Sequence, residues 1–282
     1  MSKNWLWQRL EDEISHMVEE FPGVAGVCVK DLKHGHMIAI RGDEDFPTAS
    51  TIKIHILTQL LLRVERGEFD LSQKIRVTPE MHVSGSGVIA YLEGEVDLGL
   101  VDLATLMIIV SDNTATNLCI DLAGIDATNA LLRELGLTRT ILRRKMQDHA
   151  AYAHNEENIA TPAECVAMLE QLYAGKPTPQ VAERCLSILK KPKRGPLNRA
   201  IPIEVPLANK PGGMERVRCD AGIVYLPRRP YAIAVMTKFG LIDVLDHELF
   251  IIEVARLVHE TMVALDTTNE YGQGIPPEYR VL

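Results

Sequence analysis

The residues most suited to chemistry are Ser50 and Lys53, which lie three positions apart in a segment with apolar residues on every side. Side chains at positions i and i+3 of a helix project from one face, with Cβ atoms about 5–6 Å apart. A serine hydroxyl is a weak nucleophile until a base takes its proton, and an apolar environment lowers the pKa of a lysine enough to make it that base. The spacing therefore predicts that Ser50 attacks a carbonyl and Lys53 activates it. The alternative is a helix cap followed by an exposed lysine.

A second polar group, Ser111-Asp112-Asn113, directly follows an apolar stretch at residues 103–110. A hydroxyl and an amide at a junction between helix and loop can relay a proton and orient the carbonyl or amide of a substrate. The alternative is that this group only caps the helix predicted to begin at Thr114.

A third group runs from Lys210 to Gly213 and lies between two predicted strands. A lysine at the end of a strand offers a positive charge to a substrate carboxylate. The two glycines that close the group allow a ligand to approach the backbone. The alternative is a plain β-turn.

Taken together and in this order, the three groups resemble the S-x-x-K, S-D-N and K-x-G motifs of class A β-lactamases and penicillin-binding proteins. Their surroundings resemble the same family, and the resemblance extends over residues 5–265. The matching segments are residues 46–53, 111–117, 160–162 and 200–202.

The resemblance implies a role for each matching side chain. Ser50 would be the acylated nucleophile, and Lys53 would be the general base or proton shuttle. Ser111, helped by Lys210, would pass a proton to the leaving group, and Asn113 would hold the amide side chain of the substrate. No cofactor and no metal are implied.

The resemblance also implies an oxyanion hole in the K-x-G region. It would be formed by the backbone N–H groups of Ser50 and Gly213, with Gly212 beside them. The middle residue of the family's K-T-G triplet is Pro211 here. The hydroxyl that the family uses against a substrate carboxylate is therefore absent, and proline removes a backbone donor from the strand.

The second departure from the family concerns the base for deacylation. Class A enzymes place a glutamate in their Ω-shaped loop, and the matching stretch here, residues 143–149, has none. Asp148 is the nearest carboxylate and is predicted to activate the hydrolytic water. Glu156 or Glu157 could take that role instead. A third possibility is that Asp148 is a structural carboxylate paired with Arg143 or Arg144.

The elements that position these groups can be predicted from hydrophobic periodicity and turn residues. An amphipathic helix at residues 4–20 precedes a β-hairpin at 24–29 and 37–40, and Ser50 opens a helix that is apolar all round and therefore buried. Residues 139–161 form a long polar loop. Further helices are predicted at residues 101–110, 114–122, 126–135, 162–173, 180–190 and 246–265, and strands at 207–210, 217–225 and 231–238.

The order of these elements predicts an α+β fold of the β-lactamase/transpeptidase type. Residues 1–45 and 205–282 would form an α/β subdomain, an antiparallel sheet flanked by helices and built from both chain ends. Residues 46–204 would form an all-helical subdomain that carries the nucleophile and the S-D-N motif. The active site should lie where the two meet.

The composition restricts the partners. A net charge of −8 over 282 residues argues against nucleic-acid binding, and no apolar run approaches the length of a membrane span. Five scattered cysteines without a C-x-x-C pair predict reduced, mostly buried thiols, and no signal peptide is recognised at the N-terminus, so a cytoplasmic location is expected. The chain could be a monomer or a homodimer.

These features favour a serine hydrolase that acts on a β-lactam or a related small amide or ester. Two other functions stay open. One is a peptidase or acyl transferase like the penicillin-binding proteins, which is acylated readily and deacylated slowly. The other is a catalytically weak homologue that binds a ligand.

Overall fold

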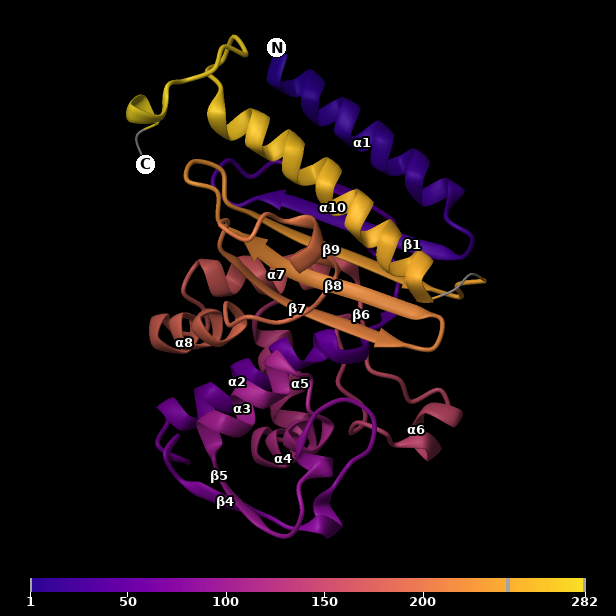
Figure 1. Cartoon of the computed structure of the whole chain (residues 1–282), viewed down its shortest axis with the longest axis vertical. Coiled ribbons are helices and arrows are strands. Elements are labelled where there is room, and N and C mark those ends of the chain that lie inside the picture. Colours follow the sequence, from indigo (N-terminus) through magenta and orange to yellow (C-terminus); the bar gives the residue numbers. More distant parts are fainter. Residues whose placement is uncertain (1, 242–243, 281–282) are drawn as a thin grey trace.

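The computed structural model describes residues 2–241 and 244–280. At its centre is a five-stranded antiparallel sheet in the order β2-β1-β9-β8-β7 (Figure 1). Both ends of the chain contribute strands, which confirms the predicted sheet. The strands are β1 (Val24–Asp31), β2 (Met37–Ile40), β7 (Leu207–Met214), β8 (Val217–Val224) and β9 (Tyr231–Lys238).

One face of the sheet is covered by the first and last long helices, α1 (Ser2–Glu20) and α10 (Val244–Thr267), which lie side by side (Figure 1). They bury a cluster of apolar side chains against the sheet. The short helix α9 (Pro196–Ala200) packs on α10, and its Leu197 belongs to the same cluster. Thus α9 packs with the sheet-flanking helices although it precedes the predicted boundary at residue 205.

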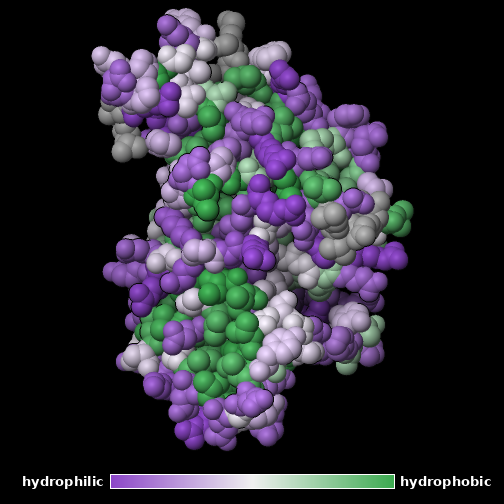
Figure 2. Space-filling view, viewed as in Figure 1, coloured by the Kyte–Doolittle hydropathy of each residue, from purple (hydrophilic) through white to green (hydrophobic). Residues whose placement is uncertain are grey.

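The other face carries the helical part, in which ten consecutive residues of α2 (Lys53–Glu65) are buried. This confirms the predicted central helix. A larger apolar cluster joins these helices to the sheet. Figure 2 shows that hydrophobic residues also gather on the surface of this helical part. The helices packed around α2 are α3 (Leu100–Ile109), α4 (Asn113–Ala123), α5 (Ile125–Glu134) and α8 (Pro179–Leu189), while α7 (Pro162–Tyr173) packs between the sheet and α8.

The strand that carries the third motif is longer than predicted. It continues through Pro211 to Met214, whereas the sequence analysis ended it at Lys210. A proline is tolerated here because β7 lies at the edge of the sheet, where one side of the strand has no ladder to maintain. The motif therefore lies on a straight edge strand and not in a turn.

Several short elements were not predicted. A second hairpin pairs β4 (Lys74–Val77) with β5 (Val96–Gly99), and β3 (Phe46–Pro47) pairs with β6 (Ile159–Ala160). The β3–β6 pair ties the end of the long polar loop to the segment before Ser50. The loop also contains α6 (His149–Ala153), and 3₁₀ turns lie at Ala49–Ile52 (η1), Pro79–Met81 (η2), Ile89–Tyr91 (η3) and Pro277–Tyr279 (η4).

The five cysteine thiols are all free and buried, as predicted. Their burial raises the thiol pKa values, which keeps them protonated and inert near neutral pH. Over residues 2–241 and 244–280, no helix has the length and apolar character needed to cross a bilayer.

Candidate active site

Ser50 lies in the 3₁₀ turn η1, which leads directly into the buried helix α2. The turn is fixed by the hydroxyl of Thr51, which donates to the carbonyl of Thr48 over 2.7 Å. Strand β7 passes so close that a Cβ atom at position 212 would lie 2.8 Å from the Ser50 nitrogen. Only glycine permits this approach. Gly212 therefore allows the edge strand β7 to pack directly against the turn that carries Ser50.

Ser111 is the hub of the polar contacts around Ser50. Its hydroxyl donates to the Ser50 Oγ over 2.8 Å. It accepts hydrogen bonds from the ammonium groups of Lys53, at 3.0 Å, and Lys210, at 3.2 Å. A hydroxyl has one donor and two acceptor positions, so the Ser111 side chain is fully used. The structure thus brings together the predicted nucleophile, both lysines and the S-D-N serine.

Lys53 is fully buried, which excludes the alternative of an exposed helix lysine. Its ammonium also donates to the carbonyl of Ser111, at 2.8 Å, and to Asn113 Oδ1, at 3.2 Å. In the described part of the chain it makes no direct hydrogen bond to Ser50, because Ser111 lies between them. If Lys53 is the base, as predicted, the proton of Ser50 would therefore have to reach the amine through Ser111.

The electrostatics of the site favour neutral lysines. Burial lowers the pKa of Lys53 well below its ordinary value, and the nearby charge of Lys210 lowers it further. Burial also lowers the pKa of Lys210, to about 7, although the carboxylate of Asp220 opposes that effect. An amine that is neutral near physiological pH can accept a proton, which is the property that the proposed base requires.

The rate of Ser50 acylation is expected to rise with pH along a limb set by Lys53, because only the neutral amine accepts a proton. Since the pKa of Lys53 is lowered, the rate should reach its plateau well below the ordinary lysine value of 10.5. The measurement is the initial rate of covalent labelling of Ser50 from about pH 5 to 9. A Lys210→Arg variant, which keeps the charge but does not titrate, should retain the limb. A flat profile in the unmodified protein would contradict a lysine base.

The S-D-N segment lines the site and also caps the N-terminus of helix α4. Asp112 is the N-cap of α4, accepting from the Ala115 N–H, and its other oxygen accepts from the N–H groups of Val88 and Ile89. The predicted capping alternative is thus correct for Asp112 and compatible with a site. Asn113 accepts from Lys53 and donates to the carbonyl of Ser84 over 2.9 Å, so its amide lines the site in a fixed orientation.

Two cavities of about 630 and 670 Å³ meet at Ser50 and form one cleft. Gly213 and Met214, at the end of β7, border both. We call them the basic arm and the loop arm. The basic arm is lined by Ser111, Lys193, Arg194, Lys210, Pro211 and Arg218, among others. The loop arm is lined by Asn113, Arg144, Met146, Gln147, His149, Tyr152 and Glu157, among others.

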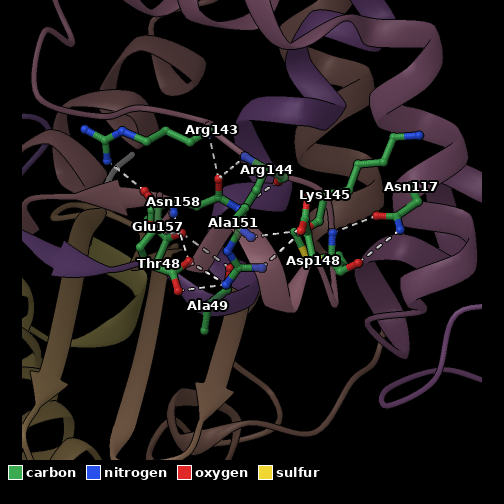
Figure 3. A network of polar contacts seen from close by, with 11 residues as sticks. Thr48, Ala49, Asn117, Arg143, Arg144, Lys145, Asp148, Ala151, Glu157 and Asn158 are labelled. Carbon is green, nitrogen blue, oxygen red and sulfur yellow. Dashed lines mark hydrogen bonds and ion pairs between the residues drawn. The ribbon is translucent and has the colours of Figure 1, made fainter. Parts of the chain in front are cut away.

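Asp148 does not line either arm, so the structure corrects its predicted role as the water-activating base. Its side chain is exposed and accepts from the Ala151 N–H over 3.0 Å, as the N-cap of α6 (Figure 3). A capping carboxylate turns back over the start of its own helix, which takes it out of the cleft. The predicted pairing of Asp148 with Arg143 or Arg144 is not formed either.

Two carboxylates line the loop arm, Glu215 and Glu157, and Glu157 is one of the predicted alternatives. It is tied to Arg144 by two contacts of 2.7 Å (Figure 3). Asn158 reinforces the pair: its Oδ1 accepts from the Arg144 N–H and its Nδ2 donates to the Arg144 carbonyl. The ion pair thus holds the two ends of the polar loop together. A carboxylate engaged in this way is poorly placed to accept a proton from water.

Replacing Glu157 with glutamine is expected to lower the free energy of unfolding by about 2 kcal/mol, because it leaves Arg144 charged and unpaired. Breaking a fully buried pair costs more, roughly 3–5 kcal/mol; here the side chains are 8% and 21% exposed. The shift in the urea midpoint is the measurement. The matched control Glu156→Gln changes an exposed neighbour and should stay within about 0.5 kcal/mol. Equal midpoints for the two variants would contradict a structural ion pair.

The structure adds cleft residues that the sequence analysis did not select. Gln147 has a left-handed backbone, with φ of +61°, and its side chain enters the loop arm. This part of the loop arm is therefore lined by an amide. Arg194 lines the basic arm, and Ser86 borders both arms. None of the described residues forms a cluster of three or more His, Cys, Asp or Glu side chains suited to a metal ion.

The whole chain can now be compared with known proteins. The family model described as "Beta-lactamase enzyme family" matches residues 9–262. The chain belongs to this β-lactamase family, which confirms the predicted resemblance and, with the solved structures below, the predicted fold class.

Individual relatives are divergent. β-Lactamase ROB-1 of Haemophilus influenzae is 28% identical over 234 residues, which cover 80% of this chain and 76% of that protein. β-Lactamase BRO-1 of Moraxella catarrhalis is 25% identical over 174 residues, or 61% of this chain and only 55% of the relative. The alignment with SME-1 of Serratia marcescens likewise spans 56% of that protein.

Two solved structures resemble the whole chain. A β-lactamase from Sphaerobacter thermophilus has a TM-score of 0.84 at 29% identity, covering 95% of this chain and 98% of that one. PBP-A has a TM-score of 0.82 at 27% identity, covering 90% and 96%. The likeness extends to a protein named as a penicillin-binding protein as well as to β-lactamases.

Proposed function

We propose that the protein is a serine hydrolase that cleaves a β-lactam or a related small amide or ester through an acyl-Ser50 intermediate. The observation that carries this proposal is the set of three contacts at Ser111, which joins the Ser50 hydroxyl to two buried lysines. A hydroxyl connected to neutral amines inside a cleft is an activated nucleophile. Membership of the β-lactamase family supports the same reaction.

The reaction would run in two halves. In the first, Ser50 Oγ bonds to the substrate carbonyl carbon while its proton moves to Ser111, whose own proton passes to a neutral lysine. The oxygen that becomes negative would lie between the N–H groups of Ser50 and Gly213. When the carbon–nitrogen or carbon–oxygen bond breaks, Ser111 returns a proton to the leaving group. Ser111 then regains a proton from the lysine. In the second half, water adds to the acyl carbon, the bond to Ser50 Oγ breaks, one proton of the water passes to Ser50 Oγ, and the acid is released.

Slow deacylation is the second candidate function, and one observation favours it. The loop wall of the cleft presents the neutral amide of Gln147 and a glutamate that is bound to Arg144. Neither of these two groups is a free base for water, and the other side chains of this arm that could accept a proton, His149 and Glu215, are both exposed to solvent. A PBP-A variant has been solved as an acyl-enzyme complex with penicillin G, and that protein shares the fold of this chain. A penicillin-binding-protein-like transferase or peptidase would have the same acylation half and a long-lived intermediate.

The deciding experiment is intact mass spectrometry after exposure to a fluorophosphonate, a panel of β-lactams and activated esters. An adduct on Ser50 that disappears within seconds supports the hydrolase. An adduct that persists for hours supports the penicillin-binding-protein-like function. Absence of any adduct, together with reversible ligand binding, would replace both proposals with a ligand-binding homologue.

We also propose that the protein acts in the cytoplasm on small molecules. Five free and buried thiols, none paired in a disulfide, support a reducing environment. Measuring its distribution between cytosolic and exported fractions of the native cell would test this location, and recovery in the exported fraction would overturn it.

A further inference from the structure

A buried thiol contacts the backbone segments that carry the two N–H groups predicted to bind the oxyanion, those of Ser50 and Gly213. Cys219 lies on β8, and its thiol donates to the carbonyl of Thr48 over 3.0 Å. The carbonyl oxygen of Gly212 lies 3.7 Å from the same sulfur and is a second, weaker acceptor. Burial raises the pKa of this thiol to about 12, so it stays a protonated donor near neutral pH. One side chain therefore contacts turn η1 and strand β7 at once.

These contacts converge at one position of β7. A Cβ atom at Gly212 would lie 2.8 Å from the Ser50 nitrogen and 2.9 Å from both Cys219 Sγ and the Thr48 oxygen. The turn, the strand and the sulfur are thus in direct contact. The peptide that links Gly212 to Gly213 is planar, so the direction of the Gly212 carbonyl also fixes the direction of the Gly213 N–H.

Thr48 is held from both ends. Its N–H and its hydroxyl donate to the carbonyl of Asn158 in the polar loop, over 2.9 and 3.1 Å (Figure 3). Its own carbonyl accepts from the N–H and the hydroxyl of Thr51, over 3.0 and 2.7 Å, as well as from Cys219. Thr51 belongs to the same turn, whereas Cys219 belongs to the sheet. The thiol is therefore the contact that relates the position of this carbonyl to the sheet.

The residue between Thr48 and Ser50 has a strained backbone. Ala49 has a φ of +44°, in the left-handed region, and such a conformation persists only where the surroundings enforce it. The Ser50 N–H belongs to the peptide that follows Ala49, so its direction depends on this conformation. The contacts that fix the Thr48 carbonyl therefore also fix the Ser50 N–H.

We infer that Cys219 is a positioning residue for the oxyanion hole: its thiol holds turn η1 and β7 so that the Ser50 and Gly213 N–H groups point at one oxygen. Oxyanion donors accelerate a reaction only when they are placed before the negative charge develops. Cys219 is 1% exposed and is not among the residues that line the cleft, so it would act through the backbone and not on the substrate. This inference rests on the proposed function, because an oxyanion forms only if Ser50 attacks a carbonyl.

The test compares Cys219→Ala with Cys219→Ser in single-turnover kinetics with a chromogenic cephalosporin, which separate the acylation rate constant k2 from the dissociation constant Ks. Cys219→Ala should lower k2 about tenfold, less than the 10²- to 10³-fold expected when an oxyanion donor is lost, because the N–H groups are displaced but not removed. Ks should stay within about twofold. Cys219→Ser keeps a donor at this position and should restore k2 to within about threefold of the unmodified protein.

Phenylboronic acid gives an independent measurement. Its boron bonds to Ser50 Oγ, whose proton passes to Ser111, and the resulting tetrahedral boronate is an anion that resembles the transition state. The inhibition constant should rise about tenfold in Cys219→Ala, because transition-state analogues depend on the oxyanion donors more than substrates do. A loss of stability alone would not change this constant in the folded protein.

Cys185→Ala is the matched control. Cys185, on α8, is another fully buried thiol, and its sulfur lies 3.5 Å from the hydroxyl of Thr58 on α2. Both alanine variants lose one buried sulfur atom, so their urea midpoints should fall by similar amounts. In Cys185→Ala, k2 and the boronate constant should stay within about twofold of the unmodified values.

Three results would overturn the inference while leaving the proposed function intact. They are an unchanged k2 in Cys219→Ala, an equal fall in Cys185→Ala, and a Cys219→Ser variant that is no faster than Cys219→Ala. If Cys219→Ala does not fold, Thr51→Val takes its place, because it removes the other side-chain donor to the Thr48 carbonyl with little change of shape. It should also lower k2, and an unchanged k2 there would overturn the inference.

Failure of the proposed function has a separate signature, in which the unmodified protein is not acylated at Ser50. No oxyanion would then form, and the positioning role of Cys219 would be overturned together with the reaction. A failed inference, in contrast, leaves the unmodified protein and all folded Cys219 variants equally active.

Discussion

Replacing Ser50 with alanine is expected to lower the turnover of a chromogenic cephalosporin or an activated ester by about 10⁴- to 10⁶-fold, as for other serine hydrolases that lose their nucleophile. Without the Oγ atom no acyl bond can form, and Ser111 loses the group to which it donates over 2.8 Å. The residual rate would come from the oxyanion donors and from binding alone. The measurement is kcat/KM, together with the intact mass after labelling.

The control for this variant is Ser86→Ala. Ser86 borders both arms of the cleft, but its side chain makes no hydrogen bond to another described residue. Its loss should leave turnover within a few fold. Thermal unfolding of both variants should match that of the unmodified protein, since neither change creates a cavity in the core. Undiminished turnover by folded Ser50→Ala would remove Ser50 from the reaction and with it the proposed function.

Much of the site could be predicted because its chemistry is local in sequence. Ser50 and Lys53 are three residues apart on a helix whose apolar residues cover every face, and such a helix must be buried. The desolvation that lowers the pKa of Lys53 follows from that burial. The order of the three motifs then identified Ser111 and Lys210, and the structure brings both to the Ser50 hydroxyl.

The rest depends on which partners the residues of the polar loop take once the loop is folded. Arg144 pairs with Glu157 and so closes the polar loop. Several other charged residues of the loop could have been partners, and their spacing in the sequence does not show which pair forms. Asp148 was predicted to act in the cleft because it was the nearest carboxylate. It is in fact the N-cap of a helix of only five residues, which is too short to show a hydrophobic period.

Strained backbone conformations are concentrated at the cleft, and the residue types alone do not reveal them. Among the described residues, seven that are not glycine have positive φ, and four of them line the cleft: Ala49, Ser111, Gln147 and Arg216. Such conformations cost about 1–3 kcal/mol each and persist only where the surroundings enforce them. At Ser111 the enforcing contacts are visible: Asp112 beside it binds three backbone N–H groups. Of these four residues, Ser111 directs its hydroxyl at Ser50.

Replacing Gln147 with glutamate is expected to speed deacylation of Ser50 by about 10²- to 10⁴-fold, the usual contribution of a positioned general base. Glutamate has the length and shape of glutamine, so the substitution replaces an amide in the loop arm with a carboxylate. The side chains of Gln147 and Asn113 both lie close to Gly85. A Cβ atom at Gly85 would be 2.6 Å from Gln147 Nε2 and 2.9 Å from Asn113 Nδ2. Asn113 in turn contacts Lys53 over 3.2 Å, which links this part of the loop arm to the network around Ser50.

The half-life of the acyl adduct, followed by intact mass after rapid removal of excess reagent, measures this effect directly. Gln147→Ala serves as the control for loss of the amide, and its adduct should live as long as that of the unmodified protein. Asp148→Asn should also leave the half-life unchanged, because the structure places that carboxylate outside the cleft. A half-life that is shortened by Gln147→Ala as much as by Gln147→Glu would show that the amide blocks water and that no base is gained. A longer half-life in Asp148→Asn would show that Asp148 does take part in deacylation.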